Sequence, residues 1–524
     1  MLGEAGQFPH MGALLLAALF IVYLWKRWTT RQKILRLGGY APRIPSYVPL
    51  GIDHQSPTGL DILFTAIRNG RRNKSLETWR GWHSCAPNNG TVEAKVLFER
   101  YLLTGDPENI KAILATQFDD FPKGQLFHDT WSQLLGDGIF STDGAPWRGS
   151  RQLMRPLFAK DRVSDLDVLE RHVQKLLRNV AAKSGQRLDL CDLLFRYTLD
   201  ASTDFLLGEP VGSLDNDTQE FAAAFDHAQH IQMMIARSGR AHVLIPRASL
   251  KKSISTINGF IQPYIDSALR LQDSTKLVER SEPDYTFLHA LAHYTRDPKL
   301  IRDQLVNILI AGRDTTASSL SWVFFELAKQ PRITTKLREE ILAHVGLDRP
   351  TYSQLKDMKY LQNVIRETLR MYPIIAFNVR VAQRDTTLPR GGGPDGLSPV
   401  GVLKGTRVFF SSLYTQRRTS LYPGDSNPEE FRPERWETWH PASWQYTPFS
   451  GGPRICIGQQ FALTEIAYTI VRLLQSFDRI EPCIEHMEPV LETNISMKPG
   501  TGVPVKLWSA ASVSNKQRVE GSAC

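Results

Sequence analysis

A single long helical segment, Asp297–Gln330, constrains the fold of this chain more than any other feature. An aspartate can cap its start, Pro298 suits a first helical turn, and another proline follows its last residue. A helix of about 33 residues is roughly 50 Å long, enough to cross a large domain. Its middle, Leu305–Ala311, is apolar on every side except at Asn307, which indicates burial. We therefore expect one large domain with this helix inside it.

Helical periodicity dominates from Pro107 to Pro373, while strand signals are fewer. Further amphipathic helices are expected at Gln152–Val180, Leu188–Leu207, Gln219–Arg237 and Ile254–Asp273. Strands are expected at Thr91–Phe98, Phe377–Gln383, Thr406–Leu413 and Val503–Leu507. The glycine-rich stretch Leu388–Gly405 is expected to be a loop, and it lacks the lysine and the helix of a phosphate-binding loop. The pattern predicts a mainly α fold with a minor β part.

Composition supports one folded body rather than several. The 524 residues would allow three or four domains by length, but no internal repeat or long linker divides them. Hydrophobic residues make up 42% and charged residues 22%, which excludes a disordered chain, a collagen-like chain and a polytopic membrane protein. We expect the domain to occupy residues 51–509 and the small, polar tail 510–524 to be frayed.

The N-terminus predicts a membrane anchor. Met11–Trp25 is an uncharged, almost wholly apolar run of 15 residues, at the lower edge of what spans a bilayer. A cleaved signal peptide would need a basic start, which is missing, and a plain basic arm would not explain the apolar run. We expect a lumenal segment at 1–10, a transmembrane signal anchor at 11–28, and a basic, proline-rich tether at 29–50.

The net charge of +9 belongs largely to this region. Six lysines and arginines and no acidic residue lie between positions 26 and 43, which predicts that the rest of the chain is cytosolic. Because the remaining chain is close to balanced, and because no nucleic-acid-binding motif is present, we predict no nucleic-acid partner. The five cysteines form no Cys-x-x-Cys pair, so a disulfide framework and a zinc ribbon are disfavoured.

One cysteine stands in a special place. The glycine- and proline-rich segment Phe449–Gly458 delivers Cys456 to the start of a helical pattern, Gln459–Leu474. Unpaired amides and the helix dipole at such an end lower the pKa of a thiol, so Cys456 should be a thiolate. A lone thiolate among glycines, which allow a flat ligand to approach, suits one axial bond to a metal cofactor. The alternative is a buried cysteine that precedes a helix.

This segment resembles the haem-binding loop of the cytochrome P450 monooxygenases. The shared pattern is Phe-x-x-Gly-x-Arg-x-Cys-x-Gly, here Phe449, Gly452, Arg454, Cys456 and Gly458. The resemblance extends over most of the chain, from about position 42 to 507. It implies the cytochrome P450 fold, haem b (iron protoporphyrin IX) as cofactor, and Cys456 as the axial ligand of the haem iron.

Three further motifs follow in the order of that family. Glu367 and Arg370, spaced i, i+3, resemble its Glu-x-x-Arg pair, and either Arg432 or Arg435 could complete the network. Trp147 and Arg151, spaced i, i+4 on a helix, resemble its haem propionate ligands. A second propionate ligand is implied at Arg380, in the strand that follows Tyr372-Pro373. With Arg454, these arginines would balance two buried propionates.

The long helix carries the polar sequence Ala311–Thr316 at its centre. Thr315 can bond back to a helix carbonyl and bend the helix. The sequence resembles the family's oxygen-binding motif, which implies that Asp314 and Thr315 relay protons. Such acid catalysis contributes roughly 10²–10⁴-fold. The alternative is a kinked helix with a satisfied polar patch.

The resemblance implies a monooxygenase that uses dioxygen and electrons from a partner. Since no flavin or nicotinamide domain is evident, we expect an NADPH-dependent cytochrome P450 reductase as that partner, at the endoplasmic reticulum membrane. The segments Leu134–Trp147, Leu199–Gly208 and Ala311–Ala317 resemble fungal alkane and fatty-acid terminal hydroxylases. That group usually has a second proline after Tyr-Pro, whereas this chain has Ala376-Phe377. The alternatives are tailoring of a fungal polyketide or terpenoid, a haem-thiolate isomerase or dehydratase, and a non-catalytic haem protein.

Overall fold

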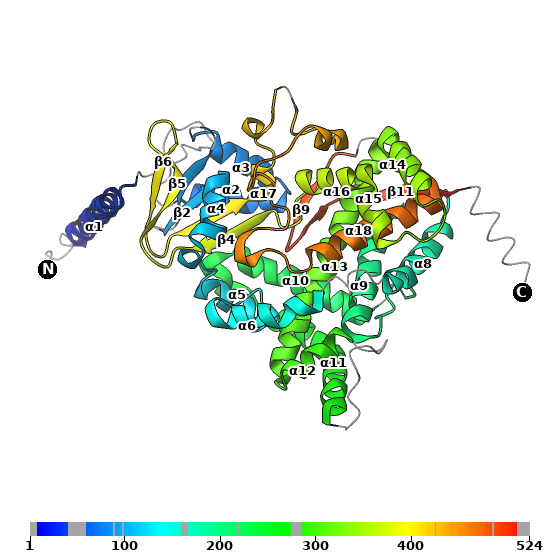
Figure 1. The fold of residues 1–524 in the computed structure, drawn as a ribbon. Coiled ribbons are helices and arrows are strands. Elements are labelled where there is room, and N and C mark those ends of the chain that lie inside the picture. The colour runs from blue at the N-terminus through cyan, green and yellow to red at the C-terminus, as the bar shows by residue number, and fades with distance from the viewer. Residues whose placement is uncertain are drawn as a thin grey trace, which may run out of the picture. The chain divides into compact units, whose positions relative to one another are not determined.

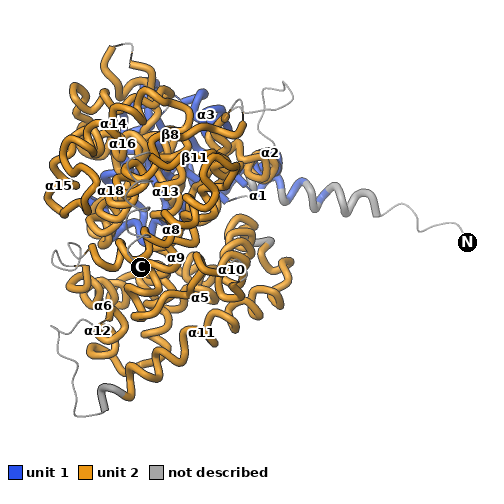
Figure 2. The backbone as a smooth tube through the Cα atoms, turned by 90° about the vertical axis from the view of Figure 1, so that its right-hand side faces the viewer, with its two compact units in different colours: residues 1–65, 77–122, 379–410 blue, residues 66–76, 123–378, 411–524 orange. Residues whose placement is uncertain are grey.

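The computed structural model describes residues 8–39, 59–86, 88, 90–96, 99–158, 166–216, 219–273, 286–424, 426–484 and 487–510. These residues divide into two compact units, shown in different colours in Figure 2. The first unit comprises residues 1–65, 77–122 and 379–410, and the second comprises residues 66–76, 123–378 and 411–524.

The first unit contains more β structure than the sequence indicated. A four-stranded sheet has the order β1-β2-β7-β4, with β1 and β2 antiparallel and β2 and β7 parallel. A hairpin, β5–β6, forms a second sheet. The elements that lie wholly or mostly in this unit are α1 (Phe8–Arg36), α3 (Ser75–His83), β1 (Thr91–Val96), β2 (Glu99–Thr104), α4 (Pro107–Lys111), β4 (Phe377–Val381), β5 (Thr386–Gly392), β6 (Ser398–Val402) and β7 (Arg407–Ser411).

The expected loop at Leu388–Gly405 was therefore wrong. Leu388 pairs with Val400 across the hairpin, and both side chains are fully buried. Gly391 and Gly393 have φ angles of 114° and 76°, which other residues rarely adopt, so the glycines make the bend and not a long loop. The high glycine content of this segment favoured the prediction of a loop, although buried apolar residues such as Leu388 and Val400 hold it as a hairpin.

The second unit is mainly helical and is built around α13 (Pro298–Lys329), the helix expected from the sequence (Figure 1). Asp297 caps it through the amide of Lys299, with proline in its first turn. The other elements of this unit are α5 (Gln125–Leu135), α6 (Gly144–Met154), α8 (Asp167–Ala181), β3 (Leu188–Asp189), α9 (Leu190–Leu207), α10 (Glu220–Arg237), α11 (Ala248–Asp273), α12 (Phe287–Tyr294), α14 (Pro331–His344), α15 (Tyr352–Asp357), α16 (Lys359–Met371), α17 (Ser412–Thr415), α18 (Gln459–Ser476), β8 (Phe477–Pro482), β9 (Leu491–Thr493), β10 (Met497–Pro499) and β11 (Pro504–Ser509). Helix α2 (Leu60–Arg71) contributes residues to both units.

The single helix expected at Gln152–Val180 was also wrong. Helix α6 ends at Met154, a 3-10 turn covers Arg155–Phe158, and α8 begins only at Asp167. Pro156 has no amide hydrogen and its ring obstructs the preceding turn, so it ends the α-helical geometry here. The bounds of the other expected helices agree with those of α9, α10, α11 and α18, and most of the helix ends differ by only a few residues.

Helix α1 begins before the expected anchor and continues beyond it. Within the part of the chain that the structure describes, no helix is long and apolar enough to cross a membrane. The transmembrane anchor expected at 11–28 is therefore not found. The apolar run has only 15 residues, fewer than the about 20 that a bilayer requires. The expected tether at 29–50 is helical as far as Arg36, where Ile34 is buried against Gly401 of β6, and residues 40–50 lie outside the described residues.

Candidate functional site

The loop before α18 holds Cys456 at a defined place. The amide of Cys456 donates to the carbonyl of Phe449 over 3.1 Å, and the amide of Ile455 donates to the carbonyl of Gly452. Gly452 has a φ of 64°, a left-handed conformation that favours glycine. The amide of Gly458, the cap residue of α18, donates to the Cys456 thiol. The loop therefore presents the side chain of Cys456 directly at the start of a helix.

The surroundings of this thiol shift its pKa in the direction opposite to the lowering expected from the sequence. Burial raises the pKa of Cys456, and the Gly458 amide and the charge of Arg151 lower it only in part. In the protein alone, the helix end therefore does not lower the pKa of this thiol below its ordinary value. A bound metal cation deprotonates a coordinating thiol outright, so the thiolate form depends on the ligand more than on the helix.

Two of the expected cations lie beside this loop. The Arg151 guanidinium donates to the carbonyl of Ile455 over 2.9 Å, and it forms no ion pair among the described residues. The Arg454 guanidinium lies 4.3 Å from the centre of the Trp147 ring. Burial and the nearby charge of Arg151 lower the pKa of Arg454 to about 10, against the opposing effect of Asp143. The structure brings Trp147, Arg151 and Arg454 together, and their role as propionate ligands stays a prediction.

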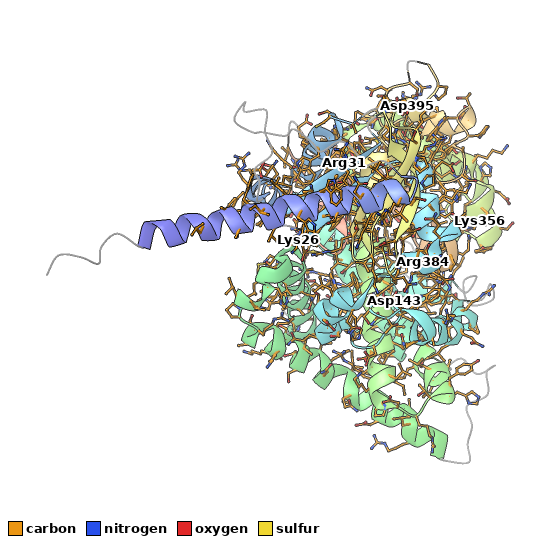
Figure 3. The ribbon with its side chains drawn as sticks, turned by 90° about the vertical axis from the view of Figure 1, so that its left-hand side faces the viewer. Lys26, Arg31, Asp143, Lys356, Arg384 and Asp395 are labelled. Atoms are coloured by element: carbon orange, nitrogen blue, oxygen red, sulfur yellow. The ribbon has the colours of Figure 1, made fainter. Side chains whose placement is uncertain are left out.

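Asp143 is a further residue of this cluster, and the sequence gave no reason to single it out. Its carboxylate accepts from Arg454 over 2.6 Å and from the backbone amides of Lys123 and Gly124. It precedes α6, and Figure 3 labels it. Asp143 therefore orients Arg454 toward Trp147. The signal available in the sequence was only its position four residues before Trp147.

Helix α13 is partly exposed to solvent at one place. Every residue from Asp303 to Ala328 is buried except Ala311, Gly312 and Thr315, which are half-buried. The Thr315 hydroxyl donates to the carbonyl of Ala311 over 2.6 Å, the back-bond expected from the sequence. Since α13 packs against α18, an accessible hydroxyl is available on a helix next to the one that follows Cys456.

Asp314 is buried and has charged neighbours. Arg313 donates to its carboxylate over 3.1 Å, and Arg313 also pairs with Asp226 on α10. Burial raises the pKa of Asp314 to about 6, although the Arg313 charge and a hydrogen bond from Gln229 oppose this. A carboxyl group with such a pKa can be present in both protonation states near neutral pH. The sequence identified Asp314 but not Arg313, which occupies the variable position of the motif.

The Glu367 network is closed by Arg435. The Arg370 guanidinium donates to both oxygens of Glu367, over 2.8 and 2.9 Å, and the Arg435 guanidinium donates to one of them over 3.3 Å. Arg432 contributes only its backbone amide. Trp436 adds an indole donor over 3.0 Å, and Tyr422 accepts from Arg370. The alternative that the sequence left open is thus resolved in favour of Arg435.

Arg380 belongs to the first compact unit, whereas the Cys456 loop belongs to the second. Its guanidinium donates to the carbonyl of Val379 and lies 5.8 Å from the centre of the Phe410 ring. Its side chain is buried. Its role as a propionate ligand stays a prediction.

The residues of the second unit suit a flat, anionic, metal-bearing group. Cys456 offers one soft ligand atom, and Arg151 and Arg454 offer positive charge. A side chain added at Gly458 would meet nothing closer than Phe158 at 3.6 Å, so the chain itself leaves room there. Among the described residues, no cluster of three or more His, Cys, Asp or Glu could hold a bare metal ion. His289, one of a histidine pair on α12, instead caps that helix with Thr286.

Comparisons with known proteins agree with this chemistry. The model of the family described as "Cytochrome P450" matches residues 89–504. "Cytochrome P450 monooxygenase pvhE" from Talaromyces variabilis is 44% identical over 509 residues, which cover 93% of each chain. "Cytochrome P450 52A1" from Candida tropicalis is 44% identical over 446 residues, or 80% of this chain and 81% of the relative. "Cytochrome P450 52A4" from Candida maltosa is 42% identical, with the same coverage.

Proposed function

This chain belongs to the cytochrome P450 family, and from that premise we propose that it hydroxylates the terminal carbon of a fatty acid or an alkane. The protein is a haem-thiolate monooxygenase, an oxidoreductase with haem b as cofactor. The haem, when bound, activates dioxygen so that one oxygen atom enters a C–H bond of the substrate. The residues described above supply the remaining functions.

We assign the binding of the cofactor to the cluster of the second unit, and we keep Arg380 as the further propionate ligand that the family resemblance implies. Cys456 would hold the iron, and Trp147, Arg151, Arg454 and Arg380 would hold the two carboxylates. Phe449, Gly452 and Gly458 shape the loop so that a flat ring can lie against its backbone. Buried guanidinium groups bind carboxylates strongly because the local dielectric constant is low.

We assign proton delivery to the half-buried part of α13 around Ala311, Gly312 and Thr315, which we call the open turn of α13. Asp314 would take up a proton from solvent, and the Thr315 hydroxyl would donate one toward the reacting oxygen. For this, the hydroxyl must leave its hydrogen bond to Ala311, and the half-buried position of Thr315 permits that rotation. A carboxyl group whose pKa lies near the working pH is efficient as both acid and base.

The substrate assignment rests on three segments that resemble fungal alkane and fatty-acid hydroxylases. Leu134–Trp147 leads into α6, Leu199–Gly208 is the end of α9, and Ala311–Ala317 is the open turn of α13. Helices α9 and α13 pack against each other. One polar residue, Asn307 of α13, binds the carbonyl of Leu135 and the amide of Phe140 and so fixes the first segment.

A second function is tailoring of a polyketide or terpenoid. The observation that favours it is the Ala376-Phe377 sequence, where the resembled hydroxylases usually have proline, next to Ile375, which is 38% exposed. The absence of this proline and an exposed apolar side chain at this place would change which substrate shapes the site accepts. This function needs the same cofactor residues and the same proton delivery.

We further propose that electrons come from an NADPH-dependent cytochrome P450 reductase and that α1 attaches the protein to the endoplasmic reticulum membrane. On α1, Phe20 and Trp25 are 60% and 64% exposed. Lys26 and Arg31 follow on the same helix (Figure 3). Exposed apolar and aromatic side chains beside basic residues are typical of a segment that binds anionic lipid surfaces.

An optical binding screen of the purified haem protein tests the proposal. Fatty acids, alkanes, polyketides and terpenoids would be added separately, and the haem absorption shift would be followed. We expect saturable shifts with long-chain fatty acids or alkanes, and a terminal alcohol as product with reductase and NADPH. Shifts confined to polyketides or terpenoids would replace the first function by the second. Activity without reductase would point to an isomerase or dehydratase.

A further inference from the structure

Arg313 lies between two carboxylates. Its guanidinium pairs with Asp314, the next residue on α13, and with Asp226 on α10. The side chains of Arg313 and Asp314 are each only 5% exposed, whereas that of Asp226 is 59% exposed. The guanidinium also lies 5.3 Å and 5.6 Å from the centres of the Phe195 and Phe225 rings. One buried cation thus has one buried and one solvent-exposed partner.

The charges explain why two partners are needed. An unpaired charge inside a protein is strongly destabilising. If Asp314 were the only partner of Arg313, protonation of Asp314 would leave a buried guanidinium without a counter-ion. Asp226 removes this obstacle because it stays paired with Arg313 while Asp314 takes up a proton.

We propose that Asp226 is the permanent counter-ion of Arg313, and that it thereby allows Asp314 to gain and lose a proton during the reaction. The proton comes from solvent and ends on a carboxylate oxygen of Asp314, while the Arg313–Asp226 pair remains neutral. Both are positioning residues that act through Asp314. The inference deepens the proton-delivery role given to Asp314 above, and it rests on that role.

The other groups that face Asp314 do not replace Asp226. Gln229, also on α10, donates a hydrogen bond to Asp314 but carries no charge. Lys498 on β10 contributes a more distant positive charge and pairs with Glu492 over 3.7 Å. The negative charge of Asp226 raises the pKa of Asp314 and the positive charges of Arg313 and Lys498 lower it. Removal of Asp226 and removal of Arg313 should therefore act in opposite directions.

The test compares D226N and R313M in the full-length haem protein. Infrared difference spectra as a function of pH report the carbonyl band of protonated Asp314, which is identified by its loss in D314N. We expect the titration midpoint to fall by about one pH unit in D226N and to rise by about one unit in R313M. The D226E variant should restore the wild-type midpoint. E220Q, a similar change in the first turn of α10, is the matched control and should shift nothing.

The outcomes separate the two claims. Unchanged midpoints in D226N, or shifts of D226N and R313M in the same direction, would overturn the counter-ion role. Separately, the amount of product formed per NADPH consumed should fall at least about tenfold in D314N. If D314N remains fully coupled while the midpoints shift as expected, the proton-delivery role of Asp314 fails and the electrostatic relation stands.

Discussion

At the scale of residues, the structure shows how buried charges are made tolerable. Glu367, Arg370 and Arg435 have almost no exposed surface, yet each charge has an opposite partner and several hydrogen bonds. Arg370 loses hydration on burial, but the charge of Glu367 outweighs this and raises its pKa. Such a cluster is stable only when it is complete, because every member depends on the others.

Glu367→Ala should therefore destabilise the protein by about 3–5 kcal/mol, since two buried guanidinium groups lose their counter-ion. Thermal or denaturant unfolding would measure the change. Glu108→Gln, which removes a largely exposed pair with Lys111, serves as the control and should cost less than about 1 kcal/mol. Equal effects of the two substitutions would contradict the structural role given to Glu367.

Cys456→Ala removes the thiol that the Gly458 amide and the loop hold in place. We expect the thiolate-haem absorption spectrum to disappear from the purified variant, because the loop has no second thiol or imidazole to replace it. Cys483→Ala, a change at a half-buried cysteine on the chain after β8, should leave the spectrum unchanged. A normal spectrum for Cys456→Ala would refute the ligand assignment.

Thr315→Ala removes the half-buried hydroxyl of α13. The variant should still consume NADPH, but product formation should fall at least about tenfold. The electrons from NADPH should instead reduce dioxygen to hydrogen peroxide. Ser321→Ala is a suitable control because its hydroxyl makes the same back-bond, to Ala317, in a fully buried position. Comparable coupling in both variants would show that Thr315 serves only the helix.

At the scale of elements, the polar residues of α13 place its neighbours. Asn307 binds the loop between α5 and α6 at both the Leu135 carbonyl and the Phe140 amide. Gln304 reaches Ser150 of α6 over 2.7 Å. The helix that carries Trp147 and Arg151 is thus fixed to the helix that carries Asp314. The need to bind this loop explains why Asn307 interrupts the otherwise apolar run Leu305–Ala311.

Asn307→Leu should destabilise the protein by about 1–3 kcal/mol for each buried backbone group left without a partner. Denaturant unfolding measures this loss, and the rate of haem dissociation should rise, because α6 is less well held. Ile308→Leu conserves volume at the next position and should cost less than about 1.5 kcal/mol. If Asn307→Leu were as stable as that control, the loop would need another anchor.

At the scale of the whole molecule, a buried acid makes stability depend on pH. Glu465 of α18 is 2% exposed and bonds to Thr316 of α13. Burial raises its pKa to about 8, against a smaller effect of the Thr316 hydrogen bond. Because the folded protein holds this proton more tightly than the unfolded chain, the contribution is fully present below about pH 4.5 and is lost as pH rises through about 8.

The melting temperature should therefore fall as pH rises from about 5 to 9, and Glu465→Gln should flatten this dependence. Glutamine keeps the shape and the ability to bond Thr316 but cannot ionise. Melting curves over this pH range make the comparison, with Glu220→Gln at the surface of α10 as the control, which should retain the wild-type slope. A slope unchanged by Glu465→Gln would mean that other groups dominate.

Most of the helices, and several contacts at the candidate site, were predictable because they depend on local sequence pattern. The capped ends and buried length of α13, the helix after the Cys456 loop, and the i, i+3 pair Glu367–Arg370 are all encoded by neighbouring residues. The two wrong predictions, the single helix at Gln152–Val180 and the loop at Leu388–Gly405, are explained by particular residues within those segments. Pro156 interrupts an otherwise helical pattern, and glycines hide the β5–β6 hairpin.

Sequence by itself determined the family of this protein and its candidate site residues, because one thiol, its arginines and an acid–alcohol pair lie in short segments whose spacing is fixed along the chain. Tertiary structure alone decided which partners complete them. Arg435 rather than Arg432 reaches Glu367, Asp143 holds Arg454, and Asp226 on a distant helix neutralises Arg313. These contacts join residues far apart in the chain, so they depend on how helices pack, which no local pattern specifies.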